Sequence, residues 1–121
     1  RVKEKDSMNF SESLKKNKDF SLVYRKGRSY ANRYLVMYVL KNGTKRNRLG
    51  ISVSKKVGNS VIRHRVTRLV RESYRLNEKS FFDGLDIIVI ARVTAKEAGF
   101  HEIENALLHL AGLHQILEKM G

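Results

Sequence analysis

The stretch RLGISVSKKVGNSVIRHRVTRLVRESYR, residues 48–75, decides the expected fold. Residues 49–54 alternate leucine, isoleucine and valine with glycine and serine, which is typical of a strand. From about Ser60 onward, apolar side chains recur every three or four positions, as in an amphipathic helix. Gly58 and Asn59 mark the turn between the two elements. The stretch therefore predicts a strand that leads directly into a helix.

The predicted helix has two chemically different faces. At about 100° per residue, its apolar arc contains Ile62, Val66, Leu69, Val70, Ser73 and Leu76. The opposite side carries His64, Arg68, Arg71 and Arg75, with Arg63 and Arg65 on its flanks. The arc can pack on a sheet while the guanidinium groups stay outside. Because these groups bind phosphate bidentately and stack on bases, the helix is a candidate nucleic-acid-binding element.

The turn before the helix adds an anion-binding feature. Lys55 and Lys56 place two ammonium groups there, and the backbone N–H groups and dipole of a helix N-terminus also favour an anion. A lone Gly58-Asn59-Ser60 would indicate only an ordinary strand-to-helix turn. Beside the arginine face, phosphate binding is the better interpretation.

The rest of the chain predicts a helix over 18–26, strands over 33–40 and 87–91, and a helix over 96–118. Asn17 and Gly27 are the expected N-cap and C-terminal stop of the first helix. The resulting order is helix, two strands, helix, strand, helix, which favours an α/β sandwich. We expect a flexible polar arm over residues 1–13 and a single domain over 14–121.

The composition indicates a globular protein that binds a polyanion. The 121 residues carry a net charge of +13 and no cysteine, which excludes disulfides, thiol catalysis and cysteine-bearing zinc sites. Residues 41–75 hold 11 basic side chains and one acidic side chain. A solvated basic face kept for solubility is the alternative, but this density favours a nucleic acid. A membrane partner is not expected, because the longest apolar run, residues 34–40, is too short to span a bilayer.

Aromatic residues suggest a second binding feature. Phe20 and Tyr24 are spaced i, i+4 on the first predicted helix, and Tyr34 and Tyr38 share a face of the strand over 33–40. Such a helix pair is usually core. However, both faces of this strand are apolar and only one can face the main core. An open face with tyrosines beside basic side chains resembles a stacking platform for single-stranded nucleic acid.

No catalytic residue and no metal site is expected in the protein. The four histidines do not form a metal-ligand pattern, and Asp83 and Asp86 flank a turn with no third carboxylate close by in sequence. No phosphate-binding P-loop and no GxGxxG motif occurs. The sequence therefore favours binding over protein-borne catalysis.

Three segments resemble the protein subunit of bacterial ribonuclease P. The most specific is residues 48–75, with its two lysines, Gly-Asn and arginine-rich helix; residues 14–39 and residues 86–92 follow the family's order as well. One position departs, because the family usually has asparagine where this chain has His64 between Arg63 and Arg65. The resemblance implies an α+β fold, a two-layer sandwich with a central four-stranded mixed sheet and a left-handed βαβ crossover.

The resemblance also implies a function. It indicates a cytoplasmic ribonucleoprotein that removes the 5′ leader of precursor tRNA by endonucleolytic cleavage, in which the catalytic RNA subunit carries the Mg²⁺ ions. The expected partners are that RNA and precursor tRNA, with no DNA and no membrane. The expected RNA-binding residues are Lys55, Lys56, Asn59, Arg63, His64, Arg65, Arg68, Arg71 and Arg75. The expected leader-binding cleft is formed by Phe20, Tyr24 and Tyr38.

Two other classes of protein fit parts of the sequence. A ribosomal or ribosome-assembly protein without an enzymatic role shares the basic charge and related folds. A sequence-specific DNA-binding module would need a helix-turn-helix pair, which the predicted elements do not provide. The RNA that copurifies with the protein would separate ribonuclease P from the ribosomal alternative.

Overall fold

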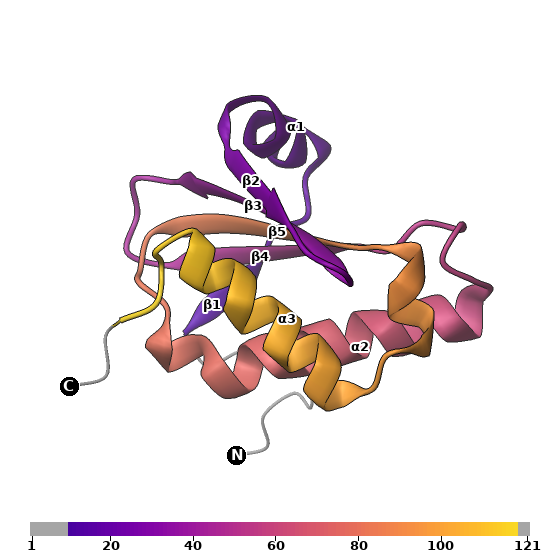
Figure 1. The fold of residues 1–121 in the computed structure, drawn as a ribbon. Coiled ribbons are helices and arrows are strands. Elements are labelled where there is room, and N and C mark those ends of the chain that lie inside the picture. Colours follow the sequence, from indigo (N-terminus) through magenta and orange to yellow (C-terminus); the bar gives the residue numbers. More distant parts are fainter. Residues whose placement is uncertain (1–9, 119–121) are drawn as a thin grey trace, which may run out of the picture.

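The computed structural model describes residues 10–118, which form a mixed sheet with helices on both of its faces (Figure 1). Along the chain the elements are β1 (Ser11–Ser13), α1 (Asn17–Lys26), β2 (Arg28–Ala31), β3 (Leu35–Lys41), β4 (Asn47–Ser52), α2 (Ser60–Asn77), the 3₁₀ turn η1 (Glu78–Ser80), β5 (Leu85–Ala91), the 3₁₀ turn η2 (Val93–Glu97) and α3 (Phe100–Leu113). The α+β class expected from the sequence is confirmed.

The sheet has five strands in the order β1-β4-β5-β3-β2, one more than expected. The parallel strands are β1, β4 and β5, while β3 runs antiparallel to β5 and β2 antiparallel to β3. The residue patterns themselves predicted only β3, β4 and β5; β2 was not predicted, and β1 lies within the segment expected to be a flexible arm. Ser11–Ser13 pair with β4, so these residues belong to the sheet; residues 1–9 of the expected arm lie outside the described residues.

Two hydrophobic cores form because the sheet is covered on both faces. Helices α2 and α3 pack on one face, where the central strand β5 contributes Ile87 and Val89 to the larger core. On the other face α1 packs alone over a smaller cluster built on Leu14, Val23 and Ile88 (Figure 1). The alternation of side chains along β5 thus supplies both cores. The sandwich has a helix on the second face, which the two-layer expectation did not include.

Several element boundaries differ from those expected. Helix α1 begins at Asn17, and Lys16 is its N-cap without a side-chain hydrogen bond. Gly27 ends α1 as expected, but with φ −77° and not in the left-handed conformation. A Cβ at Gly27 would stand 2.6 Å from the carbonyl oxygen of Val23 and 2.9 Å from that of Val39. Glycine is therefore required by the close approach of α1 to β3.

The C-terminal helix is shorter than the predicted span over 96–118. Gly99 is the N-cap of α3, and its backbone N–H donates to the carboxylate of Glu102 at 2.8 Å. The helix ends at Leu113, and Gln115 has a positive φ of 59°. The chain then turns back so that Leu117 pairs with Phe81 in an isolated bridge. Within residues 10–118, none of the helices has the length and apolarity that crossing a membrane requires.

A buried polar network holds β1 against α2. The Tyr74 hydroxyl is fully buried and hydrogen-bonds the Ser11 hydroxyl at 2.7 Å. Ser11 also donates to Glu78 at 2.9 Å, and Asn47 donates to the Tyr74 oxygen at 3.3 Å. Burial is the main cause that raises the pKa of Tyr74. Each buried polar group in the network therefore has a partner, which offsets its loss of hydration.

Candidate RNA-binding surface

The basic helix α2 is fixed at its N-terminus by a short turn after β4. The N–H of Val57 donates to the carbonyl of Ser54 at 3.0 Å, and the Val57 side chain is buried. Asn59 is the N-cap, and its side-chain oxygen accepts from the N–H of Ile62 at 3.0 Å. Lys55 and Lys56 are exposed on this turn. The turn therefore presents two ammonium groups beside a helix N-terminus, as the sequence predicted.

The buried face of α2 is rotated relative to the predicted arc. Its buried residues are Val66, Val70, Ser73 and Tyr74, whereas Leu76, assigned to the apolar arc, is 55% exposed. Tyr74 lies in the core because the Ser11 hydroxyl provides a partner for its hydroxyl group. The rotation leaves the arginine side of the helix on the surface.

The predicted RNA-binding arginines fall into two groups. Two have partners inside the protein: Arg65 donates to the carbonyl of Ala98 at 2.7 Å, and Arg75 pairs with Glu72 through Nη2 at 2.5 Å. Hydrogen bonding to Arg75 lowers the pKa of Glu72. Arg65 therefore ties α2 to the end of η2, and part of the charge of Arg75 is compensated within the helix.

The second group, three arginines and the predicted His64, has no such hydrogen bond or ion pair to other residues within 10–118. His64 and Arg68 are exposed, and Arg71 is half-buried. Arg63 is also half-buried, and among the described residues its Nε is a buried side-chain nitrogen without a hydrogen-bond partner. A donor left in that state costs free energy until a partner accepts from it. These four side chains are the part of α2 best placed to meet an external acceptor.

The three aromatic residues predicted to form the cleft come together between α1 and the sheet. The Phe20 and Tyr24 ring centroids are 6.2 Å apart, and those of Tyr24 and Tyr38 are 5.0 Å apart with an edge-to-face angle of 81°. Burial is the main cause that raises the pKa of Tyr24, and its hydroxyl hydrogen-bonds Ser52 of β4. Tyr24 nevertheless remains 39% exposed. The three rings form a continuous aromatic surface that an unstacked base can contact.

Gly50 of β4 makes room for this surface. A Cβ at Gly50 would stand 2.6 Å from Cζ of Phe20 and 3.3 Å from Cβ of Leu14. The ring of Phe20 therefore lies directly over the strand backbone. Tyr34 was expected on the same strand as Tyr38, but β3 begins at Leu35 and leaves Tyr34 outside it. The hydroxyl of Tyr34 donates to Glu102 at 3.2 Å, so this ring lies beside α3 and away from the other three.

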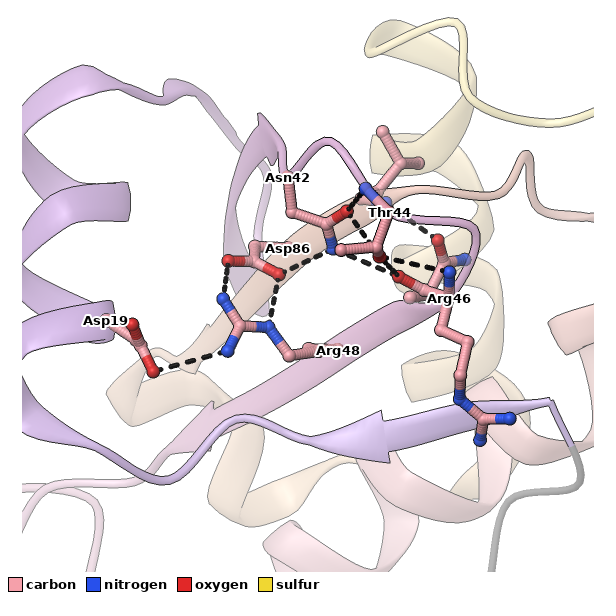
Figure 2. Close-up of polar contacts among 8 residues, drawn as sticks. Asp19, Asn42, Thr44, Arg46, Arg48 and Asp86 are labelled. Atoms are coloured by element: carbon pink, nitrogen blue, oxygen red, sulfur yellow. Dashed lines mark hydrogen bonds and ion pairs between the residues drawn. The ribbon is translucent and has the colours of Figure 1, made fainter.

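An ion-pair network that sequence reasoning missed holds α1 to the sheet. Arg48 contacts the carboxylates of both Asp86 and Asp19, and Asn42 donates to Asp86 at 2.9 Å (Figure 2). Hydrogen bonding to Asp86 is the main cause that raises the pKa of Arg48. The available signal was a single acidic residue inside the otherwise apolar segment LDIIVIA, because a buried carboxylate requires a cationic partner.

The described part of the chain does not gather ligands for a metal ion. Over residues 10–118, no group of three or more histidine, aspartate or glutamate side chains lies close enough to hold one. Asp86 is engaged with Arg48 and Asn42, and Asp19 with Arg48. The surface is thus built from cations, amides and aromatic rings, which suit the phosphates and bases of a nucleic acid.

Comparisons with known proteins agree with this chemistry. The sequence model of the family described as Ribonuclease P matches residues 8–115. The ribonuclease P protein component of Lachnoclostridium phytofermentans is 60% identical over 107 residues, which cover 88% of this chain and 92% of that protein.

Solved structures give the same result for the fold. The Staphylococcus aureus RNase P protein superposes with a TM-score of 0.82 and 40% identity, covering 89% of this chain and 99% of that one. A second S. aureus structure, described as a mutant with defective mRNA degradation activity, has a TM-score of 0.82 and 42% identity, covering 87% of this chain and 89% of that one.

Proposed function

The chain belongs to the ribonuclease P protein family, and from that premise we propose that it binds a catalytic RNA subunit and the 5′ leader of precursor tRNA. The observation that carries this proposal is the presence of a cationic surface and a separate aromatic surface on one small domain. A cationic helix lies on one face of the sheet, and the three aromatic rings lie on the other. Together they can hold a structured RNA and a single strand at the same time.

Helix α2 is assigned to the RNA subunit. Lys55, Lys56 and Arg68 are exposed cations, and each phosphate that they neutralise releases bound counterions from the RNA. Asn59 keeps its amide nitrogen available, because its cap uses the side-chain oxygen. His64 replaces the usual asparagine of the family and supplies a ring nitrogen as a hydrogen-bond donor.

The cleft is assigned to the leader. Phe20, Tyr24 and Tyr38 offer ring faces and edges, and a base of any sequence can stack on such a surface. Loss of one stacking ring is expected to cost about 1–3 kcal/mol. The cleft therefore adds affinity for precursor tRNA that mature tRNA, without a leader, does not receive.

We assign the cleavage chemistry to the RNA subunit and its Mg²⁺ ions. Two-metal hydrolysis of a phosphodiester needs ligands that hold the ions about 3.5–4 Å apart. The protein's contribution is to neutralise phosphate repulsion and to place the leader. This role matters most when Mg²⁺ is too scarce to screen the repulsion between RNA segments.

The S. aureus mutant raises a second candidate function, degradation of mRNA. The same cationic surface and aromatic cleft would bind a single-stranded message. The lack of a metal-ligand group over residues 10–118 favours the first function. A reaction with protein alone and an unstructured RNA separates the two, because only the second function predicts degradation there.

The leader assignment is tested with holoenzyme reconstituted from the protein and the RNA subunit. The measurement is the ratio of affinities for precursor and mature tRNA, called the leader ratio below, for the wild type and for Tyr38→Ala. We expect a decrease of about 5- to 150-fold in the ratio. The control is Tyr30→Ala, because Tyr30 packs edge-to-face on His114 at 4.7 Å, away from the cleft. An equal loss for both tRNAs in Tyr38→Ala would remove the assignment.

A further inference from the structure

Asp86 is a buried carboxylate in the central strand of the sheet. Its side chain is only 3% exposed, and it lies near the start of β5 between Leu85 and Ile87. A carboxylate in such surroundings is stable only when hydrogen bonds and an opposite charge replace its hydration. The neighbouring strand β4 supplies a guanidinium group, and the loop before β4 supplies an amide that donates a hydrogen bond.

Arg48 faces Asp86 directly across the parallel pair of β4 and β5. Its Nε donates to Oδ1 at 2.8 Å and its Nη2 to Oδ2 at 2.6 Å, so the two groups meet as a planar fork. Asn42 donates to the same Oδ1 at 2.9 Å and to the carbonyl of Arg46 at 3.0 Å (Figure 2). The guanidinium plane is therefore fixed by the sheet.

The third guanidinium nitrogen reaches a different element. Nη1 of Arg48 donates to Oδ2 of Asp19 at 3.3 Å, and Asp19 lies in the first turn of α1 (Figure 2). Arg48 thus connects α1 to β4 and β5 by charge-assisted bonds. Lysine could not replace it, because a single ammonium group lacks the fork that engages two carboxylates in fixed directions.

This connection matters because few apolar contacts hold α1. The cluster beneath α1 contains three buried residues, Leu14, Val23 and Ile88, whereas the cluster on the opposite face contains twenty among the described residues. Hydrophobic burial is not directional, so a small cluster tolerates sliding of the helix. The single charge-assisted bond from Arg48 to Asp19 resists it, because the bidentate pair with Asp86 fixes the direction of the guanidinium group.

The residue after Asp19 is Phe20, the first ring of the aromatic cleft. Phe20 contacts the backbone of Gly50 and the ring of Tyr24, and Tyr24 contacts Tyr38. A displacement of the first turn of α1 therefore changes the spacing of all three rings. The ion pair and the aromatic rings are therefore coupled through the first turn of α1.

We propose that Arg48 is a positioning residue that, through Asp19 and Asp86, sets the first turn of α1 and thereby the geometry of the aromatic cleft for the leader. This inference rests on the proposed function of the cleft. Arg48 does not need to touch RNA for this role. Its effect on affinity is confined to substrates that carry a leader. An ion pair that only stabilised the fold would not distinguish substrates with a leader from those without one.

The primary test is Asp19→Asn in the reconstituted holoenzyme. The substitution removes the charge on α1 and leaves the buried Arg48–Asp86 pair intact, so the fold is not left with an unpaired buried charge. We expect the leader ratio to fall about two- to fivefold, the range of a partly exposed ion pair. Affinity for mature tRNA should stay at the wild-type value, and the unfolding midpoint should fall only slightly, because the pair that is lost is partly exposed.

The matched control is Glu12→Gln. Glu12 pairs with Arg46 at 3.1 Å, and this pair joins β1 to the loop before β4. The control removes the same charge, so any effect of net charge on RNA binding is shared. It should leave the leader ratio unchanged. A fall in the ratio equal to that of Asp19→Asn would overturn the proposal in favour of simple electrostatics.

A double variant separates this inference from the proposed function. In a Phe20→Ala background, Asp19→Asn should cause no further loss, because the ring carried by the first turn of α1 is absent. If Tyr38→Ala lowers the ratio and Asp19→Asn does not, the cleft assignment stands and Arg48 has no positioning role. If Tyr38→Ala leaves the ratio unchanged, the cleft assignment and the positioning role are both wrong.

Discussion

Gly27→Ala tests whether α1 meets β3 as closely as the structure describes. The new Cβ would stand 2.6 Å from the carbonyl oxygen of Val23 and 2.9 Å from that of Val39. Ordinary C···O contacts lie at about 3.3–3.6 Å, so the end of α1 must move by about 0.5–1 Å. Both obstructing atoms belong to the backbone and cannot rotate away. One of them also accepts the N–H of Gly27 at 2.7 Å.

The expected loss of stability follows from these contacts. Overpacking of this kind costs about 1–3 kcal/mol, and the φ of −77° at Gly27 adds no penalty for alanine. Alanine recovers a few tenths of a kcal/mol by restricting the unfolded chain. The free energy of unfolding should fall by about 1–2.5 kcal/mol, which lowers the thermal midpoint by roughly 3–12 °C for a chain of this size.

Gly112→Ala is the control for the thermal unfolding measurement. Gly112 lies inside α3, and a Cβ there has no neighbouring heavy atom within 4 Å. Gly112→Ala should raise the free energy of unfolding by about 0.5–1 kcal/mol, because alanine favours the helical conformation more than glycine does. Stability of Gly27→Ala at or above the wild-type value would refute the close contact between α1 and β3.

Three further predictions concern the basic helix, the buried network and a histidine. Arg68→Ala should flatten the log–log dependence of RNA affinity on salt by about one unit, and Arg75→Ala should flatten it less because its guanidinium is paired with a carboxylate; equal slopes would contradict this. Tyr74→Phe should lower the free energy of unfolding by about 1–2 kcal/mol in a denaturant titration, since it removes two buried hydrogen bonds. Burial lowers the pKa of His114, so the unfolded chain takes up the proton first and stability should decrease as pH falls below about 6.5. His114→Gln should flatten that decrease, and an unaltered pH profile would exclude the histidine as its cause.

Sequence reasoning identified the elements that carry strong periodicity. Helix α2 was expected from about Ser60 and begins at Ser60. The strands expected over 49–54 and 87–91 are found over 47–52 and 85–91, so each boundary differs by no more than two residues. These segments bury apolar side chains on regular spacings, and that burial is what a pattern reports.

The two edge strands were missed for a physical reason. Ser11–Ser13 and Arg28–Ala31 are mostly polar and mostly exposed, because each has only one neighbouring strand. The place of Ser11–Ser13 in the sheet depends on partners far away in sequence, namely the strand β4 and the side chain of Glu78, which accepts from the N–H of Phe10 at 3.2 Å. A local pattern contains no signal for such pairing.

The residue types of the candidate site could be predicted from the sequence, but the contacts that its side chains make within the fold could not. The aromatic rings and the exposed cations are the ones the sequence indicated, and their roles in RNA binding stay predictions. The engagement of Arg65 with the carbonyl of Ala98 and the link from Arg48 to α1 were not expected. Both depend on which segments the fold brings together, since the groups involved lie about thirty residues apart or more in sequence.

Cleavage of precursor tRNA by separated and recombined components tests most directly whether this chain contributes binding and not chemistry. The protein is freed of RNA by denaturation and refolding, and the 5′ ends of the products are mapped across a Mg²⁺ titration. We predict no cleavage by the protein alone, and leader removal by protein and RNA subunit together at a lower Mg²⁺ concentration than the RNA needs by itself. Specific leader removal by the refolded protein alone, abolished by substitution of one of its acidic residues, would contradict the assignment and make this chain a nuclease.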